Sequence, residues 1–282
     1  MAQLSPKDRA ATLRSLLNPS KPAIAMASHN ALSARIAQQA GFSAVWVNAS
    51  ILPMSVTLEV ARSMGVAAPQ VPLVVDLDTG FGNAVNVAYS APQFDAAGAA
   101  AVVLEDKAFP KDSSLRTGGR HGLVTVEEFR GKIAAARSST SLVVIARTEA
   151  LIAGLGLGEA LRRAEAYAEA GADAILIHSK QTTPDEIVAF CKAWDGAVPL
   201  VIVPTSYPSL GFDEVAALSK VGLIICGNHA VRAAVGAMRK VFTSILEARS
   251  LSAVENEIPS VSEIFVLQGD SRMREIEKEF LR

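Results

Sequence analysis

Short apolar, β-branched runs alternate with helical patterns along nearly the whole chain, and this alternation restricts the fold more than any other feature. The runs are apolar on both faces, as are the strands of a parallel sheet covered by helices. The expected strands are 23–27, 44–47, 73–76, 101–105, 142–147, 174–178, 200–203 and 223–226. Because a helical segment follows each strand and no glycine-rich dinucleotide fingerprint follows any, the sequence predicts an α/β protein with a (β/α)8 TIM barrel.

The connections and the two ends of the chain complete this prediction. A glycine between small residues precedes several strands, where it lets a helix end in the left-handed region. These glycines are Gly41, Gly98, Gly171 and, in a weaker copy, Gly222. Ser5 and Pro6 predict an extra N-terminal helix, and the residues after Pro259 predict a polar, charged helical tail. No internal linker is evident, so we expect one domain, 1–282, formed by a barrel with terminal helical additions.

Composition and charge exclude several classes of protein. With 282 residues, of which 50% are hydrophobic, the chain can bury a barrel-sized core. Its formal net charge of −1 is unlike the clustered basic excess of proteins that bind nucleic acid or membrane surfaces. No apolar run reaches membrane-spanning length and charges begin at Lys7, so we expect no signal peptide and a cytoplasmic protein. Cys191 and Cys226 have apolar surroundings and no metal-ligand spacing, which indicates buried, reduced thiols.

Polar residues stand where most of the expected strands end. The carboxyl ends of barrel strands meet on one face, which carries the active site. Asp76 and Asp78 follow one expected strand, and Glu105 ends the next. Three carboxylates with room for water suit Mg²⁺ or Mn²⁺, and no His or Cys pattern indicates zinc. The sequence therefore predicts a metal site at these three residues, although each Asp alone could instead cap the next helix.

A long polar loop, residues 106–120, follows the strand that ends in the third predicted metal ligand. It combines basic groups, hydroxyl groups and a Gly-Gly pair. Such a loop suits a lid that closes over an anionic substrate, whereas the simpler alternative is a solvated surface loop. The candidate lid residues are Lys107, Lys111, Ser113 and Ser114.

Arg147 and His178 end two further strands, and we expect them to lie across the barrel from the metal site. Arginine presents a fork that matches carboxylate or phosphoryl oxygens. Histidine can donate to an oxyanion or move a proton near neutral pH. Both side chains are therefore candidates for substrate binding and catalysis. An ion pair between Arg147 and Glu149 is the alternative for the arginine, and it stays open.

Five motifs resemble the isocitrate lyase/phosphoenolpyruvate mutase superfamily, and the similarity covers almost the full chain. Within that superfamily they resemble the phosphonate branch, which holds phosphonopyruvate hydrolases and phosphoenolpyruvate mutases. The motifs are His-Asn-Ala-Leu-Ser-Ala-Arg (29–35), Asp-Leu-Asp-Thr-Gly-Phe-Gly-Asn (76–83), Glu-Asp-Lys-Ala-Phe-Pro-Lys (105–111), Ala-Gly-Ala-Asp-Ala-Ile-Leu-Ile-His-Ser-Lys (170–180) and Gly-Asn-His (227–229).

The resemblance implies a Mg²⁺-dependent enzyme that cleaves the P–C bond of phosphonopyruvate to pyruvate and phosphate. It implies that the metal stabilises the pyruvate enolate as a Lewis acid and is held by Asp76, Asp78 and Glu105. The substrate-binding residues implied are Trp46, Asn48, Ala49, Ser113, Ser114, Arg147 and His178, and the catalytic ones are Lys107, Lys111, Ser113, Arg147 and His178. It also implies a homotetramer, a dimer of dimers, whose C-terminal helices can exchange between subunits.

One lid position distinguishes hydrolase from mutase. In the family pattern that this chain resembles, mutases have Lys-x-Asn-Ser at this position of the lid, and the hydrolase has threonine in place of the asparagine. This chain reads Lys111-Asp112-Ser113-Ser114. Because serine is chemically closer to threonine and can orient a water for attack on phosphorus, the sequence favours hydrolysis, with the mutase reaction as the alternative.

The chain departs from the family pattern after Trp46. The family continues with Gly-Ser-Gly and a loop that carries a further aspartate, whereas residues 47–53 here run directly towards the next helix. The loop is shorter and its aspartate is missing, and the nearest acid, Glu59, is expected within that helix. The sequence therefore predicts an intact metal half of the site and an altered phosphonyl half.

Two further functions stay open. The first is a carbon–carbon lyase or decarboxylase acting on an oxaloacetate-like acid, which uses the same enolate stabilisation. In the pattern of those lyases the lid reads Lys-x-Cys-Gly-His, whereas the lid of this chain contains no cysteine. The second is a non-catalytic barrel that binds a keto acid, against which the carboxylate set and the basic lid argue. Each of these functions has a small anionic keto acid as its partner.

Overall fold

The computed structural model describes residues 5–47 and 52–281. In this part of the chain eight parallel strands form a closed barrel in sequence order, and β8 pairs with β1. The strands are β1 (Ala23–Ser28), β2 (Ala44–Val47), β3 (Leu73–Asp76), β4 (Ala101–Glu105), β5 (Val143–Thr148), β6 (Ala174–Ile177), β7 (Leu200–Ile202) and β8 (Val221–Cys226). The predicted (β/α)8 barrel is confirmed, with strand ends within two residues of those expected.

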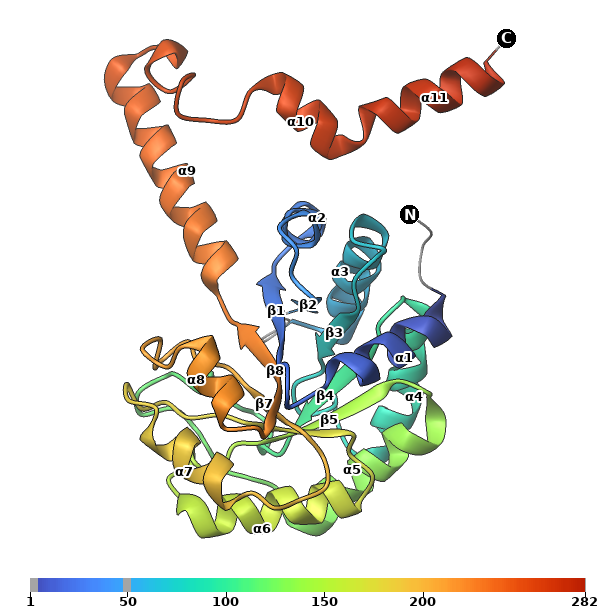
Figure 1. Ribbon diagram of the computed structural model, residues 1–282, viewed down its shortest axis with the longest axis vertical. Coiled ribbons are helices and arrows are strands. Elements are labelled where there is room, and N and C mark those ends of the chain that lie inside the picture. The colour runs from blue at the N-terminus through green and yellow to red at the C-terminus, as the bar shows by residue number, and fades with distance from the viewer. Residues whose placement is uncertain (1–4, 48–51, 282) are drawn as a thin grey trace. The chain divides into compact units, whose positions relative to one another are not determined.

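Helices follow the strands and cover the outside of the barrel, as Figure 1 shows for α4 to α7. Asn30 and Asn83 start two of them with capping boxes, which satisfy backbone donors at the helix start. The helices are α1 (Pro6–Leu16), α2 (Ala31–Gln39), α3 (Met54–Ala67), α4 (Ala84–Ala96), α5 (Val126–Ser139), α6 (Gly156–Glu169), α7 (Asp185–Ala193) and α8 (Phe212–Ala217).

The predicted N-terminal helix is confirmed, and it covers the amino end of the barrel. The hydroxyl of Ser5 accepts a hydrogen bond from the Asp8 amide at the start of α1. Leu13 and Leu17 are buried in the same apolar cluster as the residues inside the barrel. The guanidinium of Arg14 donates to the carbonyl of Leu142, directly before β5. Because α1 covers this end, the opposite end is left for the site.

Three of the four glycines behave as predicted. Gly41, Gly98 and Gly171 have φ values of 89°, 96° and 102°, in the left-handed region that glycine adopts readily. The prediction for Gly222 is wrong, since Ser219 has the positive φ, 53°, at that connection. Gly222 lies inside β8, where a Cβ would stand 2.8 Å from the backbone of Leu17. This glycine therefore allows close backbone packing.

The chain divides into two compact units, Met1–His229 and Ala230–Arg282. The second unit holds the predicted helical tail, and none of its described helices has a buried residue. These helices are α9 (His229–Ala248), α10 (Val261–Gln268) and α11 (Asp270–Phe280), with a 3₁₀ turn at Leu251–Ala253. The single domain and the exchange of these helices between subunits stay predictions. None of the helices described is both long enough and apolar enough to cross a bilayer.

Candidate active site

The carboxyl ends of the strands and the β4–α5 loop enclose a cavity of about 100 Å³. This loop, residues 106–125, contains the segment 106–120 that the sequence predicts as a lid, and it is called the lid below. The predicted residues that line the cavity are Trp46, Asp76, Lys111, Ser113, Ser114, Arg147 and His178. Asp78, Glu105 and Lys107 contact these side chains directly. Asn48 and Ala49 lie outside the described residues, and Glu59 lies within α3, as expected.

The three predicted metal ligands lie together at the ends of β3 and β4. Asp76 and Glu105 are the last residues of these strands, and both are buried. Asp78 has a φ of 53°, and its amide donates to Asp76 Oδ1 over 2.9 Å. Its carbonyl accepts from the Glu105 amide over 2.8 Å. The turn after β3 therefore joins the three acidic residues through backbone hydrogen bonds.

Two cationic side chains contact this carboxylate set. Lys111 Nζ lies 2.5 Å from both Asp78 Oδ1 and Glu105 Oε1. Arg147 Nη1 lies 3.7 Å from Asp76 Oδ2. Among the residues that the structure describes, no three His, Cys, Asp or Glu side chains are arranged to hold a metal ion. The carboxylates are thus near one another, but with Lys111 positioned between two of them.

The chemistry of the carboxylate set nevertheless fits a divalent cation. Burial is the main cause that raises the pKa of Asp76 to about 7, and the negative charge of Asp78 is the second. The carboxylates of the set therefore repel one another when they are ionised. Asp78 Oδ1 and both carboxylate oxygens of Glu105 are buried, and each faces a cationic side chain, Lys111 or Arg147. Buried carboxylate oxygens need a cation or a donor. A set made only of carboxylate oxygens suits Mg²⁺ or Mn²⁺.

The expectation that Arg147 lies across the barrel from the metal ligands is wrong. Arg147 Nε lies 3.5 Å from Glu105 Oε2. The reason is the register of the sheet, because β4 and β5 are neighbours and Glu105 and Arg147 are paired across them. The alternative partner, Glu149, is also present, with its Oε1 2.5 Å from Arg147 Nε. Arg147 therefore joins the carboxylate set to the rest of the site.

His178 follows β6 and completes the polar wall beside Arg147. Arg147 Nη2 lies 3.0 Å from His178 Nδ1. Since a guanidinium can only donate, Nδ1 is the acceptor and Nε2 carries the proton. Burial, opposed in part by Glu149 and aided by the charge of Arg147, lowers the pKa of His178. A neutral imidazole with a protonated Nε2 can donate a hydrogen bond to an anionic substrate.

The lid is attached at its base and inserts one side chain into the site. The Ala108 amide donates to the Gly122 carbonyl, and the Val124 amide donates to the Asp106 carbonyl. Of the two adjacent serines, Ser114 is buried and Ser113 is exposed at the rim of the cavity. The lid therefore supplies one buried hydroxyl and one that solvent can reach.

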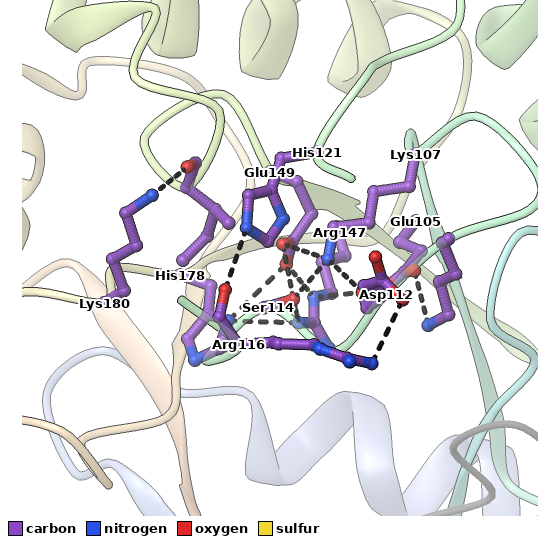
Figure 2. Close-up of polar contacts among 12 residues, drawn as sticks. Glu105, Lys107, Asp112, Ser114, Arg116, His121, Arg147, Glu149, His178 and Lys180 are labelled. Atoms are coloured by element: carbon purple, nitrogen blue, oxygen red, sulfur yellow. Dashed lines mark hydrogen bonds and ion pairs between the residues drawn. The ribbon is translucent and has the colours of Figure 1, made fainter. Parts of the chain in front are cut away.

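Two buried acids, Asp106 and Glu149, also belong to the site; the sequence predicts no role for Asp106 and offers Glu149 only as the alternative ion-pair partner of Arg147. Glu149 contacts Lys107, Arg147 and the lid (Figure 2). Asp106 accepts the backbone hydrogen bond of Glu149. The signal for Glu149 was present, because residues i and i+2 of a strand lie on one face and Arg147 is two residues earlier.

The chain is similar to known proteins over most of its length. The family model for phosphoenolpyruvate phosphomutase matches residues 13–246. The phosphonopyruvate hydrolase of Variovorax sp. (strain Pal2) is 56% identical over 96% of this chain and 98% of its own length. The phosphoenolpyruvate phosphomutase of Streptomyces hygroscopicus is 43% identical over 90% of this chain and 86% of its own.

Solved structures give the same result. A phosphonopyruvate hydrolase in complex with oxalate and Mg²⁺ superposes with a TM-score of 0.90 at 52% identity, covering 97% of this chain and 99% of that one. A phosphoenolpyruvate phosphomutase from Streptomyces platensis subsp. rosaceus gives 0.92 at 42%, with the same coverage. The resemblance read from the five motifs is confirmed, and the chain belongs to the phosphoenolpyruvate phosphomutase family.

Proposed function

We propose that this protein is a Mg²⁺-dependent hydrolase that converts phosphonopyruvate and water to pyruvate and phosphate. The observation that carries the proposal is that one small cavity places a carboxylate set beside a cationic wall. Asp76 lines the cavity and belongs to the set with Asp78 and Glu105, while Arg147 and His178 line the wall next to it. A keto acid that carries a phosphonyl group matches this arrangement, because it has metal-binding oxygens at one end and an anionic group at the other.

The chemistry requires that the P–C bond break with its electron pair left on carbon. The product is the enolate of pyruvate, which takes up a proton at that carbon, while water oxygen forms the new bond to phosphorus. When bound at the carboxylate set, Mg²⁺ would supply positive charge at the enolate oxygen. Phosphoryl transfer of this kind depends mainly on positioning and on charge stabilisation.

The residues of this chain supply those two effects. Three cationic side chains would stabilise the negative charge on the phosphonyl oxygens, namely Arg147 and the lid lysines Lys107 and Lys111. His178 donates from Nε2 to the same group, and Ser114 keeps the lid close to it. Ser113, at the exposed rim of the cavity, orients the attacking water. Trp46 closes the wall formed by β2.

A relative's name also supports a second candidate, isomerisation between phosphonopyruvate and phosphoenolpyruvate. The Streptomyces hygroscopicus relative is named for that reaction and is 43% identical to this chain. Hydrolysis is preferred for two reasons. Ser113 occupies the lid position at which the mutase pattern has asparagine, and the Variovorax relative, which is 56% identical to this chain, is named a hydrolase. A lyase acting on an oxaloacetate-like acid is the third candidate, and the lid lacks the cysteine that it requires.

We propose a cytoplasmic enzyme, in agreement with the lack of a membrane-spanning helix among the described helices. We further propose a homotetramer, supported by apolar side chains exposed on the second unit, such as Phe242, Leu246 and Phe265.

The test is an assay of the purified protein with Mg²⁺ against phosphonopyruvate, phosphoenolpyruvate and oxaloacetate, following phosphate and pyruvate together. Release of both products in equal amounts from phosphonopyruvate supports hydrolysis. Formation of phosphoenolpyruvate without phosphate would replace it with the mutase reaction. Turnover of oxaloacetate alone would replace it with the lyase reaction.

A further inference from the structure

Glu149 is a buried carboxylate on which four of the predicted site residues converge (Figure 2). It is 0% exposed, and it lies just past the end of β5. Its two oxygens face different partners. Oε1 lies 2.5 Å from Arg147 Nε and 3.5 Å from His178 Nδ1, and Oε2 lies 2.6 Å from Ser114 Oγ and 3.2 Å from Lys107 Nζ.

A second buried layer fixes Glu149 in place. Its backbone amide donates to Asp106 Oδ1 over 2.8 Å. The other oxygen of Asp106 accepts from Tyr167 Oη over 2.8 Å and from Arg163 Nη1 over 3.1 Å. Both donors belong to α6, a helix outside the barrel. This helix therefore fixes Asp106, and Asp106 in turn fixes the backbone of Glu149. A carboxylate supported in this way orients its partners with little freedom.

Charge explains why a carboxylate is needed at this position. Lys107 and Arg147 are both buried, and both point at Ser114, so without an anion two cations would repel each other at close range. Burial alone would raise the pKa of Glu149, but the charge of Arg147 outweighs it and lowers the pKa well below its usual value. The ionised carboxylate therefore balances the cations before an anionic substrate arrives.

The lid is part of the same network through a single hydroxyl. Ser114 Oγ donates to Glu149 Oε2, and it accepts from Lys107 Nζ over 2.7 Å and from Arg147 Nη2 over 2.9 Å. All the hydrogen-bonding capacity of a hydroxyl is used by these three contacts. Ser114 can fill this position only when the lid is closed onto the barrel, so lid closure and the orientation of Arg147 depend on each other.

We propose that Glu149 is a positioning residue that anchors the closed lid through Ser114 and fixes the guanidinium of Arg147 by its Nε edge. The inference rests on the proposed function for its kinetic consequence. Glu149 is itself anionic, so it does not attract the phosphonyl group. Its contribution is to the geometry of the groups that stabilise the transition state, and it therefore acts on kcat more than on KM.

The experiment compares Glu149→Gln, Glu149→Asp and Ser114→Ala with the unchanged protein. Glu149→Gln keeps the shape and removes the charge, and we expect kcat to fall about 100-fold, as small misplacements of catalytic groups do, with KM changed less than about threefold. Glu149→Asp keeps the charge and should restore part of kcat. Glu128→Gln, a partly exposed acid paired with Lys132, is the matched control and should leave both constants unchanged.

Hydrogen exchange of the lid peptide 107–115, measured without substrate, separates this inference from the proposed function. We expect faster exchange in Glu149→Gln and in Ser114→Ala, and no additional effect in the double variant, since both changes break one anchor. Because Ser114→Ala leaves the buried charges paired, it tests the anchor even if Glu149→Gln does not fold. Lid exchange equal to the unchanged protein in Ser114→Ala, or a normal kcat in a folded Glu149→Gln, would overturn the inference.

Discussion

Lys111 Nζ lies 2.5 Å from Glu105 Oε1, so a side chain of the lid directly contacts a carboxylate predicted to bind the metal. The same nitrogen lies 2.5 Å from Asp78 Oδ1. Burial lowers the pKa of Lys111, but the carboxylates of Glu105, Asp76 and Asp78 raise it by more. The ammonium group therefore stays charged, and in this structure it satisfies oxygens that a divalent cation would also use.

The first prediction follows from this competition. Replacing Lys111 with methionine should increase the affinity for Mg²⁺ measured without substrate by about tenfold, because a cation no longer shares the same oxygens. Turnover should fall, since the lid lysine is lost. Calorimetric titration with Mg²⁺ alone measures the affinity. Lys180→Met is the control, because its ammonium donates to the carbonyl of Ile152 instead. Unchanged or weaker Mg²⁺ binding in Lys111→Met would show that the contact does not compete.

The second prediction concerns Asp76. Asp76→Asn should lower turnover by at least about 100-fold while the fold is retained, because a bound metal contributes several kcal/mol of charge stabilisation. Circular dichroism and Mg²⁺ calorimetry, run beside the assay, separate loss of metal from loss of fold. Asp95→Asn, which changes an acid that pairs with Thr140 away from the cavity, should remain active. Substantial turnover by Asp76→Asn without added metal would remove the metal assignment.

The sequence predicted the strands well for a physical reason. Strands such as Val143–Thr148 are buried on both faces, so their apolar pattern is continuous and is bounded by polar turns. The prediction that Gly222 ends a helix is wrong because the need for a small residue there comes from the backbone of Leu17, which is distant in sequence. A contact of this kind leaves no local signal.

The sequence predicts which residues belong to the candidate site, but it does not predict which of their side chains contact one another. Strand ends identify Glu105 and Arg147, yet their contact depends on the register between β4 and β5, which the sequence does not state. The position of Lys111 between two carboxylates depends on how the lid folds back. Long-range charge pairs of this type require the closed barrel before they can be identified.

The third prediction tests the role of Ser113. Ser113→Asn should reduce phosphate release by about tenfold or more, because an amide in place of the hydroxyl no longer orients the water. Phosphoenolpyruvate should appear instead, and ³¹P NMR distinguishes it from phosphonopyruvate and phosphate. Ser113→Thr keeps the hydroxyl and serves as the matched control, with phosphate release retained. Equal hydrolysis by the asparagine variant would exclude Ser113 from the reaction.

The fourth prediction concerns the two thiols, which are both free; Cys191 is buried as expected, but the same expectation is wrong for Cys226, which is half-buried. Burial raises the pKa of Cys191 to about 12, so at pH 8 almost no thiolate is present and the group is inaccessible. A maleimide or disulfide reagent should therefore leave Cys191 unmodified in the native protein and modify it in guanidinium. Mass spectrometry of the labelled peptides gives the result, and Cys191→Ala identifies the peptide. Rapid native labelling of Cys191 would contradict its burial.

The last prediction is a pH dependence in the lid. Asp112 accepts from the backbone amide and the side chain of Arg120, and these hydrogen bonds lower the pKa of Asp112 to about 2. A free aspartate titrates near about 3.9, so ionised Asp112 favours the closed turn. This contribution is complete above about pH 4 and is lost as pH falls through about 2. Carboxyl ¹³C NMR should give a midpoint near 2, Asp112→Asn should remove that resonance, and Arg120→Ala should raise the midpoint. A midpoint near the free value would mean that the Asp112–Arg120 turn does not hold in solution.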